Sequence, residues 1–189
     1  NKTARAIRFG IPAVFSGGIK KNFISLCKFE KRLSAWLRDN KNEYDVIHAF
    51  DFDTGLVAKH AAKKYNKGRI IVVFGCGGNR DKEKRAKMGE IAGRLADFTV
   101  ITTDNPRDEK PAEIIADIEL GMKQTRGLYK AIENRRQAIK FAMRIAWKSD
   151  VIIIAGKGHE KYQEIENGKR LFFDDKEIVK KIAEEMPDK

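Results

Sequence analysis

Three short apolar runs in this chain are each followed directly by a polar motif marked by glycine or proline. The runs are residues 69–74, 98–102 and 151–155, all rich in Val, Ile or Thr. The motifs are residues 75–81 (GCGGNRD), 104–107 (DNPR) and 156–160 (GKGHE). Repeated strand-then-loop units are typical of an open parallel sheet, in which ligands bind outside the carboxyl ends of the strands. We therefore predict that the three motifs converge on one edge of one sheet.

Helical patterns lie between these runs. The spacing of apolar residues predicts helices at 84–96, 111–122, about 131–148 and about 176–185, the last capped by Asp174 or Asp175. An Asn-Gly turn at 167–168 predicts a hairpin joining 162–165 to 170–173. Because alternating strands and helices build right-handed βαβ units, we predict an α/β fold with a Rossmann-like, mostly parallel sheet flanked by helices.

The first 68 residues are the more basic part of the chain. They hold 14 Lys and Arg against 6 Asp and Glu, in a chain whose net charge is +12. This balance indicates either contact with an anionic partner or a solvated basic face. Neither a basic motif interleaved with aromatic residues nor a zinc-ligand spacing points to nucleic acid. We expect no nucleic-acid partner and at most a weak contact with an anionic surface.

Cysteine and histidine usage argues against a metal centre and against a thiol or serine hydrolase. The two cysteines, Cys27 and Cys76, form neither a disulfide framework nor a zinc pattern. His159 and Glu160 have no second cluster of metal-ligand residues beside them, and no G-x-S-x-G motif occurs. No apolar run approaches the roughly 20 residues of a membrane span, and no signal-peptide pattern is visible. We expect no metal site and a cytoplasmic protein.

The residue types in the three motifs suit an amino-acid ligand. Arg80 and Arg107 carry guanidinium forks, which pair with carboxylates or phosphates. Asn105 supplies an amide beside Pro106, which stiffens the loop. Glu160 is able to accept a hydrogen bond from an ammonium group.

Plainer interpretations stay open for each motif. Residues 75–78 match neither G-x-G-x-x-G nor a P-loop, so a tight packing turn explains them more simply than a phosphate cradle. Residues 104–106 are explained equally well as a turn, which leaves only Arg107 without a reason.

Residues 69 to about 185 closely resemble the C-terminal domain of the Mur ligases that add meso-diaminopimelate to UDP-N-acetylmuramoyl-dipeptide. The resemblance rests on VVFGCGGNRD (72–81), KR (84–85), MG (88–89), DNPR (104–107), AGKGHE (155–160) and FDD (173–175), in matching order and spacing. It implies a Rossmann-like domain that holds the incoming amino acid. It also implies that DNPR selects diaminopimelate over lysine, with Arg107 pairing with the distal carboxylate.

The same resemblance implies which residues bind meso-diaminopimelate. They are Arg80, Asp104, Asn105, Pro106, Arg107, Gly156 and Glu160, with Lys157 and His159 as secondary candidates. One departure is Asn79, where the family usually has Asp.

The rest of the chain predicts an incomplete enzyme. The resembled ligase uses ATP and Mg²⁺ and needs a central ATPase domain with a P-loop and an N-terminal domain for the UDP-sugar. Neither is present in this sequence. We therefore expect no catalytic residue and no cofactor bound by this chain alone, and whether the chain is an enzyme stays open.

Residues from about 5 to 66 instead resemble part of the N-terminal half of a GT-B glycosyltransferase. The similar stretch is YDVIHAFDFDTG (44–55), preceded by a basic amphipathic helix. We interpret the chain as a chimera joined near 66–69. Its parts would be a basic helical extension at 1–42 and a Rossmann-like domain at 43–189, with 43–66 a transplanted strand–helix unit. The alternatives are a glycosyltransferase fragment or a ligand-free α/β scaffold.

Overall fold

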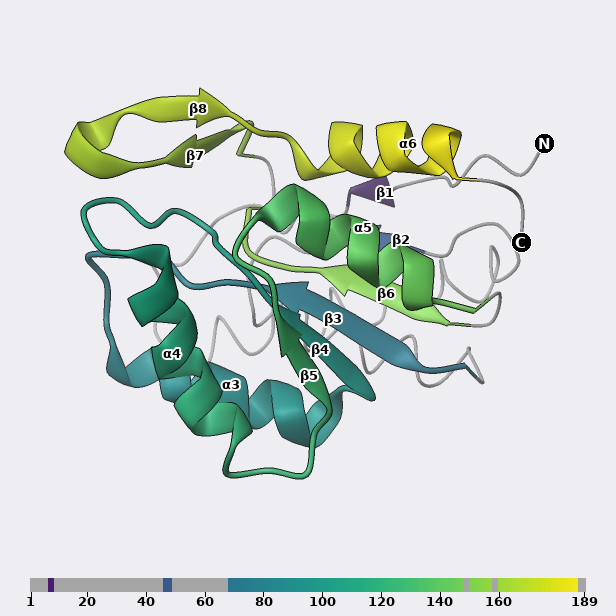
Figure 1. Cartoon of the computed structure of the whole chain (residues 1–189), viewed down its shortest axis with the longest axis horizontal. Coiled ribbons are helices and arrows are strands. Elements are labelled where there is room, and N and C mark those ends of the chain that lie inside the picture. The colour runs from purple at the N-terminus through teal and green to yellow at the C-terminus, as the bar shows by residue number, and fades with distance from the viewer. Residues whose placement is uncertain (1–6, 9–45, 49–67, 148–149, 158–159, 187–189) are drawn as a thin grey trace, which may run out of the picture.

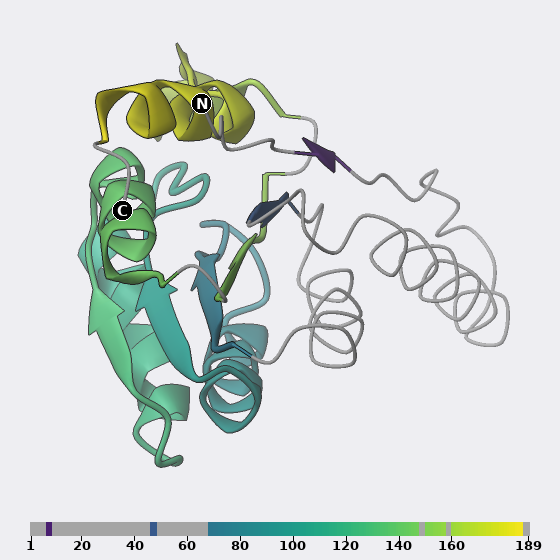
Figure 2. The same ribbon diagram turned by 90° about the vertical axis from the view of Figure 1, so that its right-hand side faces the viewer.

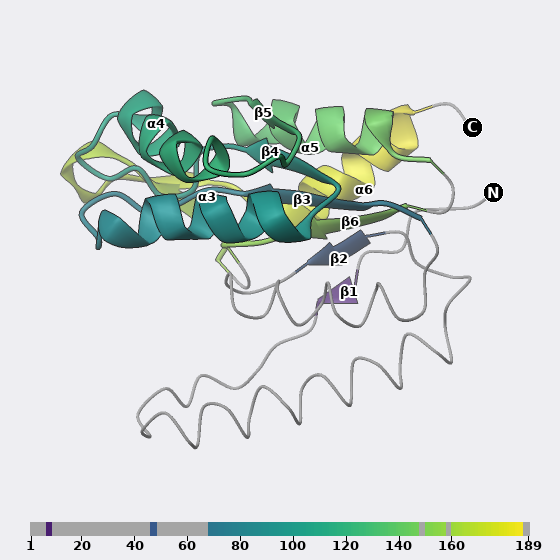
Figure 3. The same cartoon turned by 90° about the horizontal axis from the view of Figure 1, so that it is seen from below.

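The computed structural model describes residues 7–8, 46–48, 68–147, 150–157 and 160–186. They form a six-stranded sheet, in which all neighbouring strands are parallel, and a two-stranded hairpin. The order across the sheet is β1-β2-β6-β3-β4-β5, and Figure 3 shows β3, β6, β2 and β1 side by side. The strands are β1 (Ile7–Arg8), β2 (Val46–His48), β3 (Ile70–Phe74), β4 (Phe98–Ile101), β5 (Tyr129–Ala131) and β6 (Val151–Ile154). The predicted fold class is confirmed.

The three strands predicted from apolar runs lie next to one another in the sheet. Val73 of β3 is in register with Val100 of β4 and Ile154 of β6, so the three strands end nearly level. Within β3, Ile70 and Phe74 pack into the core on one face and Val73 into the core on the other. Because both faces are covered, these strands are continuous apolar runs rather than alternating ones.

In the part of the chain that the structure describes, two pairs of helices cover the two faces of the sheet. In Figure 1, α3 (Glu83–Leu95) and α4 (Pro111–Met122) lie to the left and lower left of the strands, and α5 (Arg135–Ile145) and α6 (Asp175–Glu185) lie above them. Figure 2 shows the same layers from the side. The loops that follow β3, β4 and β6 leave the sheet at one end, called the carboxyl edge below.

The structure corrects the helix predicted at about 131–148. Tyr129–Ala131 form the edge strand β5, which pairs with Thr99–Ile101 of β4. Ile132, expected on the core face of the helix, continues this pairing because its N–H donates to the carbonyl of Ile101 (2.9 Å). The helix begins only at Arg135, since the side chain of Asn134 accepts a backbone N–H from the first turn and caps it.

The predicted hairpin and the last helix are confirmed. β7 (Tyr162–Glu164) and β8 (Arg170–Phe172) pair antiparallel, and Asn167 and Gly168 take positive φ angles between them. Asp174 caps α6 by accepting two backbone N–H bonds. Apart from β1 and β2, the extension at 1–42 and the unit at 43–66 lie outside the described residues.

In the part of the chain that the structure describes, no helix is both long and apolar enough to cross a membrane.

Candidate amino-acid site

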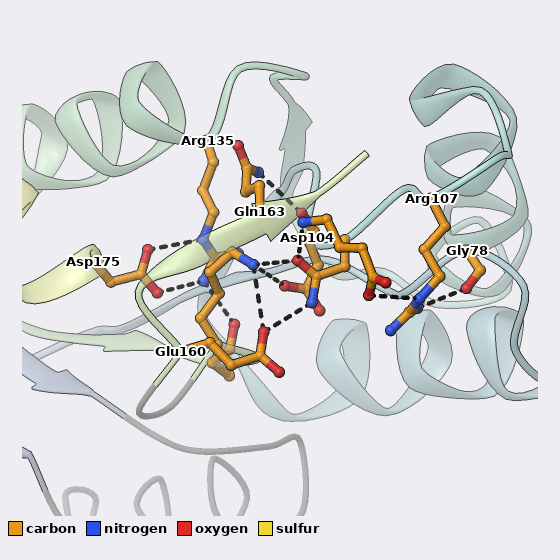
Figure 4. Close-up of polar contacts among 11 residues, drawn as sticks. Gly78, Asp104, Arg107, Arg135, Glu160, Gln163 and Asp175 are labelled. Carbon is orange, nitrogen blue, oxygen red and sulfur yellow. Dashed lines mark hydrogen bonds and ion pairs between the residues drawn. The ribbon is translucent and has the colours of Figure 1, made fainter. Parts of the chain in front are cut away.

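The loops after β3, β4 and β6 contact one another at the carboxyl edge, as predicted. The backbone N–H of Gly78 donates to the carbonyl oxygen of Asn105 (2.8 Å). The Nζ of Lys157 donates to the side-chain oxygen of Asn105 (2.6 Å). Asn105, on the middle loop, therefore links the other two loops. Figure 4 shows the polar contacts of this region, with Asp104 and Glu160 labelled.

Asn105 uses nearly all of its hydrogen-bonding capacity inside the protein. It is only 5% exposed. Its Oδ1 accepts from Lys157 and from the N–H of Glu164 (3.0 Å), and its Nδ2 donates to Oε2 of Glu160 (2.8 Å). An amide bonded at both ends has little capacity left for a ligand. In this structure Asn105 organises the loops, and its direct contact with an amino acid stays a prediction.

Lys157 is the buried cation of this group. Its Nζ lies 3.2 Å from Oδ1 of Asp104 and 3.7 Å from Oε2 of Glu160, and its side chain is wholly buried. Buried lysines require such partners because an unpaired buried charge is strongly destabilising. We call Asp104, Asn105, Lys157 and Glu160 the Asn105 cluster. Within the described residues, Oε1 of Glu160 has no hydrogen-bond partner.

Arg107 is held at two of its nitrogens. Its backbone lies in the left-handed region, with φ of 51°. Its Nε donates to Oε2 of Glu164 (3.0 Å) and its Nη1 to the carbonyl of Gly78 (2.8 Å). Among the described residues Nη2 meets no acceptor. A guanidinium is able to donate five hydrogen bonds, so donors remain for an added carboxylate.

Arg80 lies exposed on the first loop, close to Arg107. A Cβ atom added to Gly77 would lie 2.9 Å from Nη1 of Arg107 and 3.4 Å from Cγ of Arg80. Glycine at this position therefore leaves open the space between the two arginine side chains. The guanidinium of Arg107 and the aliphatic stem of Arg80 therefore border one point at the carboxyl edge. Two arginines on neighbouring loops suit an anionic ligand.

Two glycines have structural reasons of their own. A Cβ on Gly78 would overlap the carbonyl oxygen of the buried Pro106, so this turn packs loop against loop. Its N–H is already bonded to Asn105, which favours the packing turn over a phosphate cradle. Gly156 has a φ of 118°, a backbone conformation that other residues rarely adopt. It lies beside the carboxylate of Asp104.

The structure gives a reason for asparagine at position 79. Asn79 donates from Nδ2 to the carboxylate of Asp108 (2.8 Å). An aspartate at position 79 would set two carboxylates against each other, which is unfavourable. The departure from the family pattern therefore suits the local charges of this chain.

Arg85 was not among the predicted site residues, yet it holds the loop 75–81 in place through hydrogen bonds. Arg85 is 1% exposed and donates to both carboxylate oxygens of Glu109 (2.8 Å each) and to Oδ2 of Asp117 (3.0 Å). It also donates to the carbonyl of Gly77 (3.2 Å). The hydrogen bonds from Arg85 lower the pKa of Glu109 to about 2. One feature of the sequence could have indicated its burial. Arg85 lies four residues before Gly89, so both are on one face of the helix, and that face is buried.

Arg135 braces the third loop in a similar way. Its Nε and Nη2 bond the two oxygens of Asp175 (2.9 and 2.8 Å), and Nη2 also donates to the carbonyl of Ala155 (3.0 Å). Burial opposes its charge, but the charge and hydrogen bonds of Asp175 raise the pKa of Arg135. Its register with the buried Ala138 and Ala142 was the available signal.

Cys76 and His159 have no demonstrated chemical role. Burial, followed by the charge of Asp104, raises the pKa of the Cys76 thiol to about 12, so it stays protonated and a poor nucleophile. His159, which was predicted with Lys157 as a secondary binding residue, lies outside the described residues.

A shallow cavity of about 760 Å³ lies at the opposite edge of the sheet. It is lined by the last residues of α3, by Ala96 and Asp97, and by the loop 123–128. This cavity is far along the strands from the three motifs, because β4 and β5 begin beside it. We place the candidate site at the carboxyl edge, where the charged groups converge.

Comparison with known proteins decides the family. The model of the family "Mur ligase, glutamate ligase domain" matches residues 56–158, more than half of the chain. The chain belongs to this family. As a Mur ligase domain, it superposes on a solved structure of UDP-N-acetylmuramoyl-L-alanyl-D-glutamate–2,6-diaminopimelate ligase with a TM-score of 0.68 and 39% identity. That match covers 74% of this chain and 28% of the other.

Two curated relatives carry the same ligase name. The protein of Caldanaerobacter subterraneus subsp. tengcongensis is 58% identical over 125 residues, which is 66% of this chain and 26% of the relative. The protein of Alkaliphilus metalliredigens is 44% identical over 183 residues, which is 96% of this chain and 36% of the relative. The Mur ligase chain therefore matches only about a quarter to a third of the length of these relatives.

These matches do not support the glycosyltransferase resemblance or the chimera. The family match begins at residue 56 and the Alkaliphilus alignment covers 96% of the chain, so both cross the junction expected near 66–69. A short apolar strand followed by a polar loop, as at 44–55, recurs in many α/β folds. Such a pattern therefore identifies no single family.

Proposed function

We propose that this Mur ligase domain binds the amino acid that a complete ligase adds, and that this amino acid is meso-diaminopimelate. The arrangement of Arg107 and Glu160 carries the proposal. Arg107 is anchored by Glu164 and Gly78, and Glu160 is anchored by Asn105 and Lys157. Among the described residues, Arg107 and Glu160 each keep polar atoms that bond to nothing. The relatives named above are 2,6-diaminopimelate ligases, which supports the choice of amino acid.

The charges of the carboxyl edge match an amino acid with a carboxylate at each end. Arg107 would pair with the distal carboxylate, Arg80 with the other one, and Oε1 of Glu160 would accept from an ammonium group. The other predicted binding residues would shape the loops: Asp104, Asn105, Pro106 and Gly156. Because lysine lacks the distal carboxylate, it would leave Arg107 without an anion and bind more weakly.

Ligation would draw on more of a complete ligase than this domain. In the complete ligase, ATP and Mg²⁺ would be held outside this domain, which spans 26% and 36% of the two relatives. We infer that the chain binds its amino acid but does not ligate alone. Turnover by this chain with ATP, UDP-N-acetylmuramoyl-dipeptide and meso-diaminopimelate would contradict this inference.

Isothermal titration with meso-diaminopimelate and L-lysine tests the proposal. We expect the wild-type chain to prefer meso-diaminopimelate, and Arg107→Lys to lose about tenfold in affinity for it, because lysine cannot form paired bonds to a carboxylate. Arg126→Lys, an exposed arginine at the opposite edge, is the matched control and should change nothing. A folded sample that gives no heat with either amino acid would refute the proposed function.

A further inference from the structure

The hairpin β7–β8 is fastened to the loop that carries Arg107. Arg107 and Ile165 form an isolated parallel bridge, and the N–H of Arg107 donates to the carbonyl of Glu164 (3.1 Å). In return, the N–H of Glu164 donates to Oδ1 of Asn105 (3.0 Å). The end of β7 therefore lies along the DNPR loop in the manner of an additional strand.

The side chain of Glu164 adds a charged contact to these backbone bonds. Its Oε2 accepts from Nε of Arg107 (3.0 Å), while Nη1 of Arg107 donates to the carbonyl of Gly78 (2.8 Å). Figure 4 shows Arg107 lying between Gly78 and a carboxylate in this way. Bonds at two nitrogens fix the plane of the guanidinium. A guanidinium that is already fixed loses less conformational freedom when it binds a carboxylate.

We propose that Glu164 is a positioning residue that makes Arg107 selective for an amino acid with a distal carboxylate. This inference rests on the proposed function. Glu164 would act through Arg107, without touching the amino acid. Losing its side chain should therefore weaken binding of meso-diaminopimelate and leave binding of lysine unchanged. Glutamine should replace it in large part, because its carbonyl oxygen is also able to accept from Nε.

Isothermal titration of Glu164→Ala and Glu164→Gln tests this role. We expect Glu164→Ala to weaken meso-diaminopimelate binding about tenfold and lysine binding by less than about twofold. Glu164→Gln should recover affinity to within about threefold of wild type. Glu166→Ala, an exposed glutamate in the hairpin turn, is the matched control. Equal losses for both amino acids, or no loss for either, would overturn the inference.

A ligand-free measurement separates this inference from the proposed function. We expect the Nε–H proton of Arg107 to exchange slowly with water by NMR in wild type and Glu164→Gln, and quickly in Glu164→Ala. If wild type binds neither amino acid, the selective role falls together with the proposed function. If wild type binds selectively but its Nε–H is unprotected, only the role of Glu164 falls.

Discussion

Removing the buried ammonium of Lys157 should loosen the whole carboxyl edge. Lys157→Met keeps a long apolar stem and removes Nζ. This atom lies 2.6 Å from Oδ1 of Asn105, 3.2 Å from Oδ1 of Asp104 and 3.7 Å from Oε2 of Glu160. Two carboxylates and an amide oxygen would then face one another without a cation between them.

The expected cost follows from the burial of these groups. Breaking a buried ion pair by removing one partner costs about 3–5 kcal/mol. Asp104 and Glu160 keep 15% and 32% of their side chains exposed, so water is able to replace part of the lost contact. We therefore expect the lower end, about 3 kcal/mol of unfolding free energy. With a urea dependence of about 2 kcal/mol per M, the midpoint should fall by about 1.5 M.

Urea unfolding followed by circular dichroism near neutral pH measures this loss. Lys161→Met is the matched control, because Lys161 is exposed four residues further along the same loop. Its midpoint should stay close to that of wild type. Equal midpoints for Lys157→Met and Lys161→Met would refute the view that the Asn105 cluster holds the three loops together.

Three further changes test other parts of the edge. Gly78→Ala places a methyl group against the carbonyl of Pro106, so it should cost about 1–3 kcal/mol in urea unfolding and weaken meso-diaminopimelate binding. Because Arg85 holds the pKa of Glu109 near 2, against an ordinary value of 4.5, this carboxylate stabilises the fold fully above about pH 4.5. The contribution, at most about 3 kcal/mol, should disappear as pH falls toward 2, so Glu109→Gln should destabilise at pH 7 and hardly at all at pH 2. The raised pKa of Cys76 predicts slow alkylation in the native chain and fast alkylation in urea, which peptide mapping by mass spectrometry detects; fast native alkylation would contradict it.

The carboxyl edge could be predicted from the sequence because continuous apolar runs identify buried parallel strands. Once those strands are parallel neighbours, the loops after them must leave at the same edge. The pairing of side chains at that edge could not be predicted in the same way. Arg85 and Arg135 lie on helices, where charged residues usually face water, and their burial depends on Glu109 and Asp175 from other elements.

Short strands could not be predicted from hydrophobic periodicity for a related reason. Tyr129–Ala131 is a three-residue strand at the edge of the sheet with two exposed residues, so it has too few apolar positions to show a period. Its hydrogen bonds to β4 make it a strand, and these bonds are long-range. The turn at 167–168 could be predicted because two adjacent residues, Asn and Gly, are enough to indicate it.

Amide chemical shifts of the chain during titration with meso-diaminopimelate test most directly whether the carboxyl edge is the binding site. We expect the changes to gather at Arg80, Arg107, Gly156 and Glu160, with smaller changes when lysine is added. Changes confined to the opposite edge, around the cavity formed by the loop 123–128, would contradict the proposed site.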